Sequence, residues 1–258
     1  MVTFVMNIHL PHGCVPDISY HALSATIYFD TSHTLRPLPE NEILHSHICE
    51  NIMLKFATLK DTVEMCDAIA RSIIADTECI AVTVHCIDLK NDEVSVEYDL
   101  TPIYLSFGSN IGDRLTHIHE AVQKCTCSHE IYLDKTSSVI DTMPIGVTSQ
   151  PNFFNMVIKA RTFLTPEQLL IRLKKIEQDM GRVWTKKNYP RIIDIDILYY
   201  GSHRIQTPHL TIPHPQVYDR PFVSALLAEI NPSCTDPVTL QMHPFFETHA
   251  WPVVERRI

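Results

Sequence analysis

The sequence has no long apolar run and no basic start. No stretch of its 258 residues approaches the roughly 20 apolar residues that a membrane-spanning helix needs. The first residues, MVTFVMNIHLPHGC, lack the basic region that opens a signal peptide. With 45% hydrophobic and 20% charged residues, the composition is typical of a soluble globular protein. These absences predict a cytoplasmic protein without a membrane partner.

Basic residues are also scarce. The chain has 21 Lys and Arg against 30 Asp and Glu, which gives a formal net charge of -9. Proteins that bind nucleic acids neutralise phosphates with an excess of Lys and Arg, so this balance argues against a nucleic-acid partner. Any phosphate chemistry must therefore depend on a local cluster of cations.

The 8 cysteines contain no C-x-x-C pair, which favours free thiols in a reducing compartment over a disulfide or zinc framework. Two H-x-H steps, His45/His47 and His117/His119, place imidazoles close together in the sequence. No third ligand lies nearby in the pattern, so a zinc site is the less favoured interpretation.

The sequence changes character near residue 100, with no repeat or low-complexity tract. Before that point, strand-like stretches at 21–29 and 80–87 flank a helical apolar pattern at 65–74. The acidic segment NDEVSVEYDLTP follows, and a new pattern begins with the strand-like IYLSF and the turn GSNIGDR. We therefore predict two domains, 1–100 and 101–258.

The second domain combines strands with an amphipathic helix. The stretch FFNMVIKAR alternates like a half-buried strand. A helix is expected after Thr165, which can cap it, with Pro166 at its first position and Gln168 completing a capping box. Gly181 is expected to end this helix. Such alternation of strands and helices predicts an α/β or α+β fold.

The segment IIDIDILYY carries the strongest chemical signal. In a strand, Ile193, Ile195 and Ile197 point into one layer, while Asp194 and Asp196 point together into the other. The two Asp Cα atoms would lie about 6.6 Å apart, so both carboxylates can reach hard cations. Two Mg²⁺ ions about 3.5–4 Å apart could then bridge the phosphates of a nucleotide. The alternative is a solvent-facing strand, although Asp is depleted in strands.

Upstream of this strand, the loop RVWTKKNYPR gathers Arg182, Lys186, Lys187 and Arg191. A charge run is usually only a solvated surface. Beside an Asp-x-Asp strand, however, these cations are placed to close over a polyphosphate.

The turn GSNIGDR lacks the spacing and the lysine of a P-loop. It is interpreted as a structural strand-to-helix connection, in which Asp113 or Asn110 caps the next helix.

Together these segments resemble a specific family. YLSFGSNIGDR, DTMPIGVTSQPNFFN, IEQDMGRV, PRIIDIDILYYG and LTIPHPQVYDRPF occur in the order and spacing of 6-hydroxymethyl-7,8-dihydropterin pyrophosphokinases, over residues 102–235. The resemblance implies a ferredoxin-like α/β fold, and ATP with two Mg²⁺ ions. It also implies transfer of the β,γ-pyrophosphate of ATP to the hydroxymethyl group of the pterin, with release of AMP, in folate biosynthesis.

The resemblance also implies roles for single residues. Asp194 and Asp196 match metal ligands, and Arg182 and Arg191 match catalytic arginines that clamp the phosphates. The positions implied for ATP are Glu177, Lys186, Lys187, Thr211, His214 and Arg220. The positions implied for the pterin, which would lie between two aromatic rings, are Thr142, Ile145, Phe153, Asn155 and Phe222. Without the resemblance, Phe153 and Phe222 would be interpreted as ordinary core.

The mobile loop departs from the family pattern. Trp184 stands where the family commonly has a second arginine, and Asn188-Tyr189 replaces Trp-Gly. We expect Lys186 and Lys187 to supply the missing charge, so that loop closure or ATP affinity changes while the reaction is retained.

The first domain more faintly resembles dihydroneopterin aldolase, through IHLPHGCVPD, SATIYFD, TVEMCDAIARSII and IAVTVHC. The Lys-Pro-Gly-Ala turn of that family is absent and Lys90 is displaced. Glu64 lies near the position of the pterin-anchoring glutamate, with a one-residue gap. The favoured interpretation is a tunnelling-fold domain with reduced or absent aldolase activity that supports a homo-oligomer. A bifunctional enzyme and a purely structural oligomerisation module are the alternatives.

Three functions remain for the second domain: an active pyrophosphokinase, a pterin- and ATP-binding protein without turnover, and a nucleotidyltransferase with an Asp-x-Asp palm. Retention of both strand aspartates, the two loop arginines and His214 favours the first. A nucleotidyltransferase should lack a pocket with two facing aromatic rings.

Overall fold

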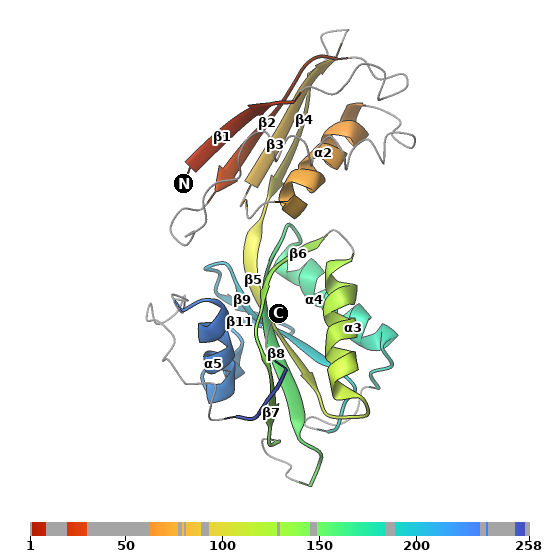
Figure 1. Ribbon diagram of the computed structural model, residues 1–258, viewed down its shortest axis with the longest axis vertical. Helices are drawn as coiled ribbons and strands as arrows, with labels where there is room; N and C mark the ends of the chain where they lie inside the picture. The colour runs from red at the N-terminus through yellow and green to blue at the C-terminus, as the bar shows by residue number, and fades with distance from the viewer. Residues whose placement is uncertain are drawn as a thin grey trace. The chain divides into compact units, whose positions relative to one another are not determined.

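A computed structural model describes residues 2–8, 20–29, 62–76, 79, 81–88, 93–127, 130–144, 149–183, 189–232, 236 and 251–255. The chain forms two compact units, Met1–Leu100 and Thr101–Ile258 (Figure 1). No helix of the described residues is both long and apolar enough to span a membrane.

The first unit is a four-stranded antiparallel sheet with one described helix. Its strands pair in the order β1-β2-β3-β4, and they are β1 (Val2–Asn7), β2 (Tyr20–Phe29), β3 (Ala81–Asp88) and β4 (Glu93–Asp99). Helix α2 (Thr62–Asp76) contacts β3 and β4. It packs there because Met65, Ile69 and Ile73 recur at helical spacing, and all three are fully buried. The strands and the helix predicted for this unit are confirmed.

Strand β4 is an element that the sequence analysis did not predict. The acidic segment before residue 100 is part of the sheet, because Glu93–Asp99 pairs along its whole length with β3. Its side chains alternate between exposed and half-buried, so the acidic residues lie on the solvent side. On the opposite side, the Tyr98 hydroxyl accepts a hydrogen bond from Arg71 of α2. Acidic composition therefore concealed the two-residue period of a strand.

The second unit contains an antiparallel sheet of six strands. Their order is β12-β7-β8-β5-β9, and β6 pairs with β8. The strands are β5 (Thr101–Ser109), β6 (Ile131–Thr136), β7 (Val139–Thr142), β8 (Phe153–Thr162), β9 (Asp194–Tyr200) and β12 (Val253–Glu255). A short hairpin joins β10 (Ile205–Gln206) and β11 (Thr211–Ile212).

Helices cover both faces of this sheet (Figure 1). Helices α3 (Arg114–Thr126) and α4 (Pro166–Asp179) lie on one face, and their apolar side chains share a core cluster with Ile193, Ile195 and Ile197. Helix α5 (Pro221–Ile230) and the 3-10 helix η2 (Pro215–Val217) lie on the other. The unit is thus a three-layer mixed α/β fold, and the predicted burial of the three isoleucines is confirmed.

The predicted start of helix α4 is also confirmed. The Gln168 backbone N–H donates to Thr165 Oγ1 at 3.3 Å, and the Thr165 N–H donates to Gln168 Oε1 at 2.9 Å. Pro166 occupies the first helical position, and Gly181 follows the helix with a φ of 87°. Helix α3 is capped by Asp113 rather than Asn110, and Asp113 accepts hydrogen bonds from Thr116.

Candidate active site

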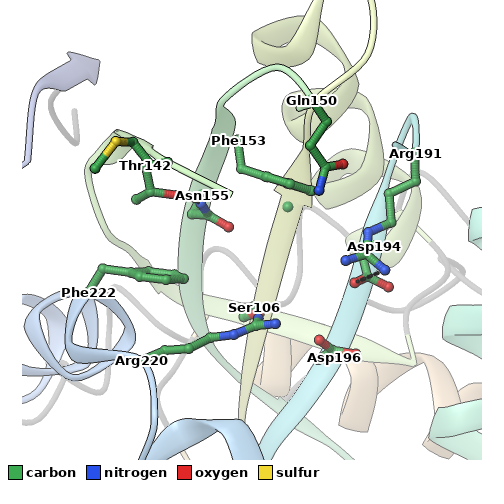
Figure 2. A pocket seen from close by; sticks show the side chains of 12 residues that line it. Ser106, Thr142, Gln150, Phe153, Asn155, Arg191, Asp194, Asp196, Arg220 and Phe222 are labelled. Carbon is green, nitrogen blue, oxygen red and sulfur yellow. Dashed lines mark hydrogen bonds and ion pairs between the residues drawn. The ribbon is translucent and has the colours of Figure 1, made fainter. Parts of the chain in front are cut away.

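A pocket opens at the edge of the second unit where β5, β8, β9 and the start of α5 meet (Figure 2). We call its two parts the aromatic half and the charged half. The aromatic half is lined by Ser106, Gly108, Thr142, Met143, Gln150, Phe153, Asn155, Arg191, Asp194, Asp196, Arg220 and Phe222. The charged half is lined by Lys174, Arg182, Arg191, Asp194, Asp196, His214, Pro215, Gln216 and Arg220. Four residues belong to both, so the halves form one continuous site.

Asp194 and Asp196 lie at the junction of the halves, as the strand alternation predicts. Their side chains are 14% and 21% exposed and point away from the isoleucine layer into the pocket (Figure 2). Asp194 is paired with Arg182 and, at 3.1 Å, with Arg191. His214 Nε2 lies 4.0 Å from Asp196 Oδ1.

The two carboxylates have different electrostatic environments. Burial alone would raise the pKa of Asp194, but the guanidinium groups of Arg191 and Arg182 outweigh it and lower the pKa. Burial, reinforced by the negative charge of Asp194, raises the pKa of Asp196. The positive charges of His214, Lys174 and Arg220 therefore do not fully offset burial and the charge of Asp194.

This imbalance fits a divalent cation. Mg²⁺ is commonly held by one or two carboxylates together with the phosphates of a substrate. Asp194 and Asp196 place two carboxylates on one strand face, and a cation bound there would offset their negative charge. No group of three or more His, Cys, Asp and Glu suited to a metal occurs in the described part of the chain, so phosphates or water would complete the coordination.

Glu177 was predicted to be an ATP-binding residue, but its side chain is fully buried and lines neither half. Its Oε1 accepts hydrogen bonds from Lys174 Nζ at 2.8 Å and from the Ile195 backbone N–H at 2.7 Å. Arg182 Nη1 lies 2.7 Å from the same oxygen. Glu177 therefore positions two cations and strand β9, and burial raises its pKa.

Lys174 is a site residue that the sequence reasoning missed. It lines the charged half and donates a further hydrogen bond to the Ile195 carbonyl at 3.2 Å. A signal was present in the sequence, since Lys174 precedes Glu177 by three residues and such a spacing places both on one helix face.

The aromatic half holds two rings and a polar pair. Thr142 on β7 faces Phe153 on β8, and Asn155 Nδ2 donates to Thr142 Oγ1 at 2.7 Å. Phe222 is 8% exposed, so it contributes to the core as well as to the pocket wall. Figure 2 shows Asn155 projecting into the space between the rings of Phe153 and Phe222.

Gly108 keeps the floor of the aromatic half open. It lies on β5 between Asp194 and Asn155, its partners on the two neighbouring strands. A Cβ atom at this position would lie 3.1 Å from Asn155 Oδ1, closer than most Cβ contacts. A side chain at this position would require Asn155 to shift.

Asn110 and Gln150 fix the edges of the pocket and were not predicted as site residues. Asn110 is 1% exposed, and its Oδ1 accepts a hydrogen bond from the Arg191 backbone N–H at 2.8 Å. Its Nδ2 donates to Gln150 Oε1 at 3.1 Å. Asn110 thereby connects the GSNIGDR turn to the segment before β9 and to the segment before β8.

The other predicted residues either lie in the described part of the chain or fall outside it. His214 and Arg220 line the charged half, whereas Thr211 pairs with Gln206 in the β10–β11 hairpin and lines neither half. The predictions for Ile145, Lys186 and Lys187 lie outside the described residues, as do those for Trp184, Asn188, Lys90, His45 and His47. His119 is paired with Glu255 at 2.7 Å.

Comparison with known proteins places the chain in a family. It belongs to the 7,8-dihydro-6-hydroxymethylpterin-pyrophosphokinase (HPPK) family, whose model matches residues 104–232. The chain is 41% identical over 139 residues to the 2-amino-4-hydroxy-6-hydroxymethyldihydropteridine pyrophosphokinase of Aquifex aeolicus, covering 54% of this chain and 86% of that protein.

Two longer proteins are also similar. The mitochondrial folate synthesis bifunctional protein of Pisum sativum is 36% identical over 160 residues, which is 62% of this chain. The folic acid synthesis protein fol1 of Pneumocystis carinii is 41% identical over 150 residues, which is 58% of this chain. This chain spans 31% and 20% of their respective lengths.

Proposed function

We propose that residues 101–258 transfer pyrophosphate from ATP to 6-hydroxymethyl-7,8-dihydropterin, releasing AMP, as a step of folate biosynthesis. The observation that supports this most directly is the continuity of the site, in which a ring-binding half and a phosphate-binding half share Arg191, Asp194, Asp196 and Arg220. The hydroxymethyl oxygen attacks the β-phosphorus, the bond from that phosphorus to the α,β-bridging oxygen breaks, and the hydroxyl proton is lost to solvent.

The aromatic half suits the pterin. A flat heterocycle gains a large contact area between Phe153 and Phe222, as planar ligands do on aromatic faces. Asn155 donates to Thr142 and keeps Oδ1 directed at the ring space, where it can accept a hydrogen bond from the heterocycle. The hydroxymethyl group would then point toward Asp194 and Asp196.

The charged half suits the triphosphate. Arg182, Arg191 and Lys174 surround the aspartates, and Arg can contact phosphate oxygens with two parallel hydrogen bonds. Asp194 and Asp196 would hold Mg²⁺, which when bound supplies positive charge that offsets the charge developing on the phosphates. Glu177 holds Lys174 and Arg182 at the wall before ATP arrives, so less ordering remains when ATP binds.

The finer assignment of the two units follows the resemblance. The second unit would be the ferredoxin-like domain of the family. The first would be a tunnelling-fold-like domain with reduced or absent aldolase activity that supports a homo-oligomer. Its four antiparallel strands and helix α2 are compatible with this assignment.

The decisive experiment incubates the full chain with ATP, Mg²⁺ and 6-hydroxymethyl-7,8-dihydropterin and follows the products by chromatography and mass spectrometry. We expect AMP and the pterin diphosphate in equal amounts, with no AMP when the pterin is omitted. Formation of ADP or inorganic phosphate would contradict pyrophosphate transfer. Binding of both substrates without AMP would support a binding protein without turnover.

A further inference from the structure

A short segment beyond the family match joins the edge of the second unit. Strand β12, in residues 251–255, pairs with β7, so that Val253 faces Ile140 and Glu255 faces Val139. The Asp141 backbone N–H donates to the Pro252 carbonyl at 2.9 Å. The segment thereby supports the strand that carries Thr142 into the aromatic half.

The same segment also contacts the opposite wall of the aromatic half. The ring of Trp251 lies 6.4 Å from the ring of Phe222, with an interplanar angle of 74°. This edge-to-face arrangement is a favoured geometry for aromatic pairs. Trp251 and Val253 pack against the core cluster that contains Phe222, whereas neither lines the pocket itself.

The far end of the segment is held by a side-chain contact. Glu255 lies 2.7 Å from His119 of α3, a helix on the other side of the sheet. Backbone pairing in the middle, the hydrogen bond between Glu255 and His119 at one end and the packing of Trp251 at the other define how the segment lies. The ring of Trp251 is therefore held in place against Phe222.

We propose that Trp251 is a positioning residue for the pterin, acting through Phe222, and that strand β12 holds it there. This inference rests on the proposed function, because it assigns the aromatic half to the pterin. Trp251 limits the tilt of the Phe222 ring, so the gap between Phe222 and Phe153 is preset for a flat ligand. The charged half does not contact Trp251, so ATP binding should not depend on it.

The test is calorimetric binding to the full chain with Mg²⁺, comparing the wild type with Trp251→Ala. The ligands are α,β-methylene ATP, which blocks transfer, and then 6-hydroxymethyl-7,8-dihydropterin. We expect Trp251→Ala to raise the Kd for the pterin about three- to tenfold, the range for loss of an aromatic pair. The Kd for the ATP analogue should stay within about twofold. Trp251→Phe should restore most of the pterin affinity.

Matched variants separate positioning from general stability. Val254→Ala removes an apolar side chain from the same strand, but Val254 is 38% exposed and should leave both Kd values unchanged. Trp251→Leu keeps an apolar side chain but loses the aromatic edge, so it should weaken pterin binding in the same direction. In a Phe222→Leu background, Trp251→Ala should have no further effect on pterin binding, because the residue it acts through is gone.

Two results would overturn the inference: an unchanged pterin Kd in folded Trp251→Ala or Trp251→Leu protein, and an equal loss of affinity for both ligands. Circular dichroism and the Tm establish folding in each case. A wild-type chain that binds no pterin would instead overturn the proposed function, and the inference with it. Failure of the proposed function can be distinguished from failure of the inference, because it is seen with the wild-type chain before any variant is made.

Discussion

The guanidinium of Arg191 lies 3.1 Å from the carboxylate of Asp194, where the aromatic and charged halves of the site meet. The same guanidinium lies 5.6 Å from the centre of the Phe153 ring. One side chain therefore contacts both Asp194, a proposed metal ligand, and Phe153 in the proposed pterin wall. Because Arg191 contacts both residues, a substitution at Asp194 or at Phe153 can disturb pterin binding and turnover together. Binding and turnover must therefore be measured separately for each variant.

The first prediction concerns the two strand aspartates. Asp194→Asn and Asp196→Asn keep the shape of each side chain and remove one charge, so the fold should persist over the buried isoleucines on the opposite face. The kcat for AMP release should fall on the order of a thousandfold or more, while the pterin Kd stays near that of the wild type. Near-normal AMP release in both variants at ordinary Mg²⁺ concentrations would contradict the metal assignment.

The second prediction concerns Glu177. Glu177→Gln removes the charge that holds Lys174 and Arg182, so the KM for ATP should rise about tenfold and the pterin Kd should change little. The free energy of unfolding should fall by about 1–3 kcal/mol, because a hydrogen-bonded buried charge is lost. Steady-state kinetics and urea unfolding measure the two effects. The exposed Glu167, in the first turn of the same helix, provides the control Glu167→Gln, which should change neither.

The third prediction concerns the loop whose centre lies outside the described residues. If Lys186 and Lys187 replace the arginine that the family has where Trp184 stands, changing both to Ala should weaken ATP use far more than pterin binding. The reason is that their charge acts only on phosphates. Trp184→Arg should be neutral or should raise turnover. Unchanged ATP kinetics in the double lysine variant would show that other cations supply the charge.

The fourth prediction uses two cysteines in one peptide. Cys125 is fully buried, and burial raises the pKa of its thiol to about 12, whereas Cys127 is exposed. Only about one part in ten thousand of Cys125 is thiolate at pH 8, and the thiolate is the reactive form. Iodoacetamide should therefore label Cys127 at least about a hundredfold faster in the native chain. Peptide mass spectrometry measures both rates, and equal rates before denaturation would contradict the packing of α3.

The fifth prediction concerns the first unit. The Lys-Pro-Gly-Ala turn is missing from the sequence, and aldol cleavage needs a base and a proton relay in fixed geometry. The full chain should release little or no glycolaldehyde from dihydroneopterin. Rapid release that Glu64→Ala abolishes would instead establish a bifunctional enzyme.

Local patterns predicted the local parts of the fold. The capping box at Thr165 and the alternation around Asp194 depend on neighbouring residues, so both could be predicted from the sequence. Strand β4 was missed because its acidic residues hid the alternation, and Lys174 was missed because its partners lie partly on β9. The pairing of β12 with β7 joins segments far apart in the chain, and no short pattern specifies such a contact.

Gly108 leaves the space beside Asn155 open because it carries no side chain. The walls of the aromatic half include the rings of Phe153 and Phe222, whereas Gly108 contributes only backbone to its lining. Substitution of the rings would alter the contact area that a ligand gains, whereas a side chain at Gly108 would take up the space beside Asn155. Chemical variation in ligands for this site is therefore best tolerated at the walls and least tolerated on the side that meets Gly108.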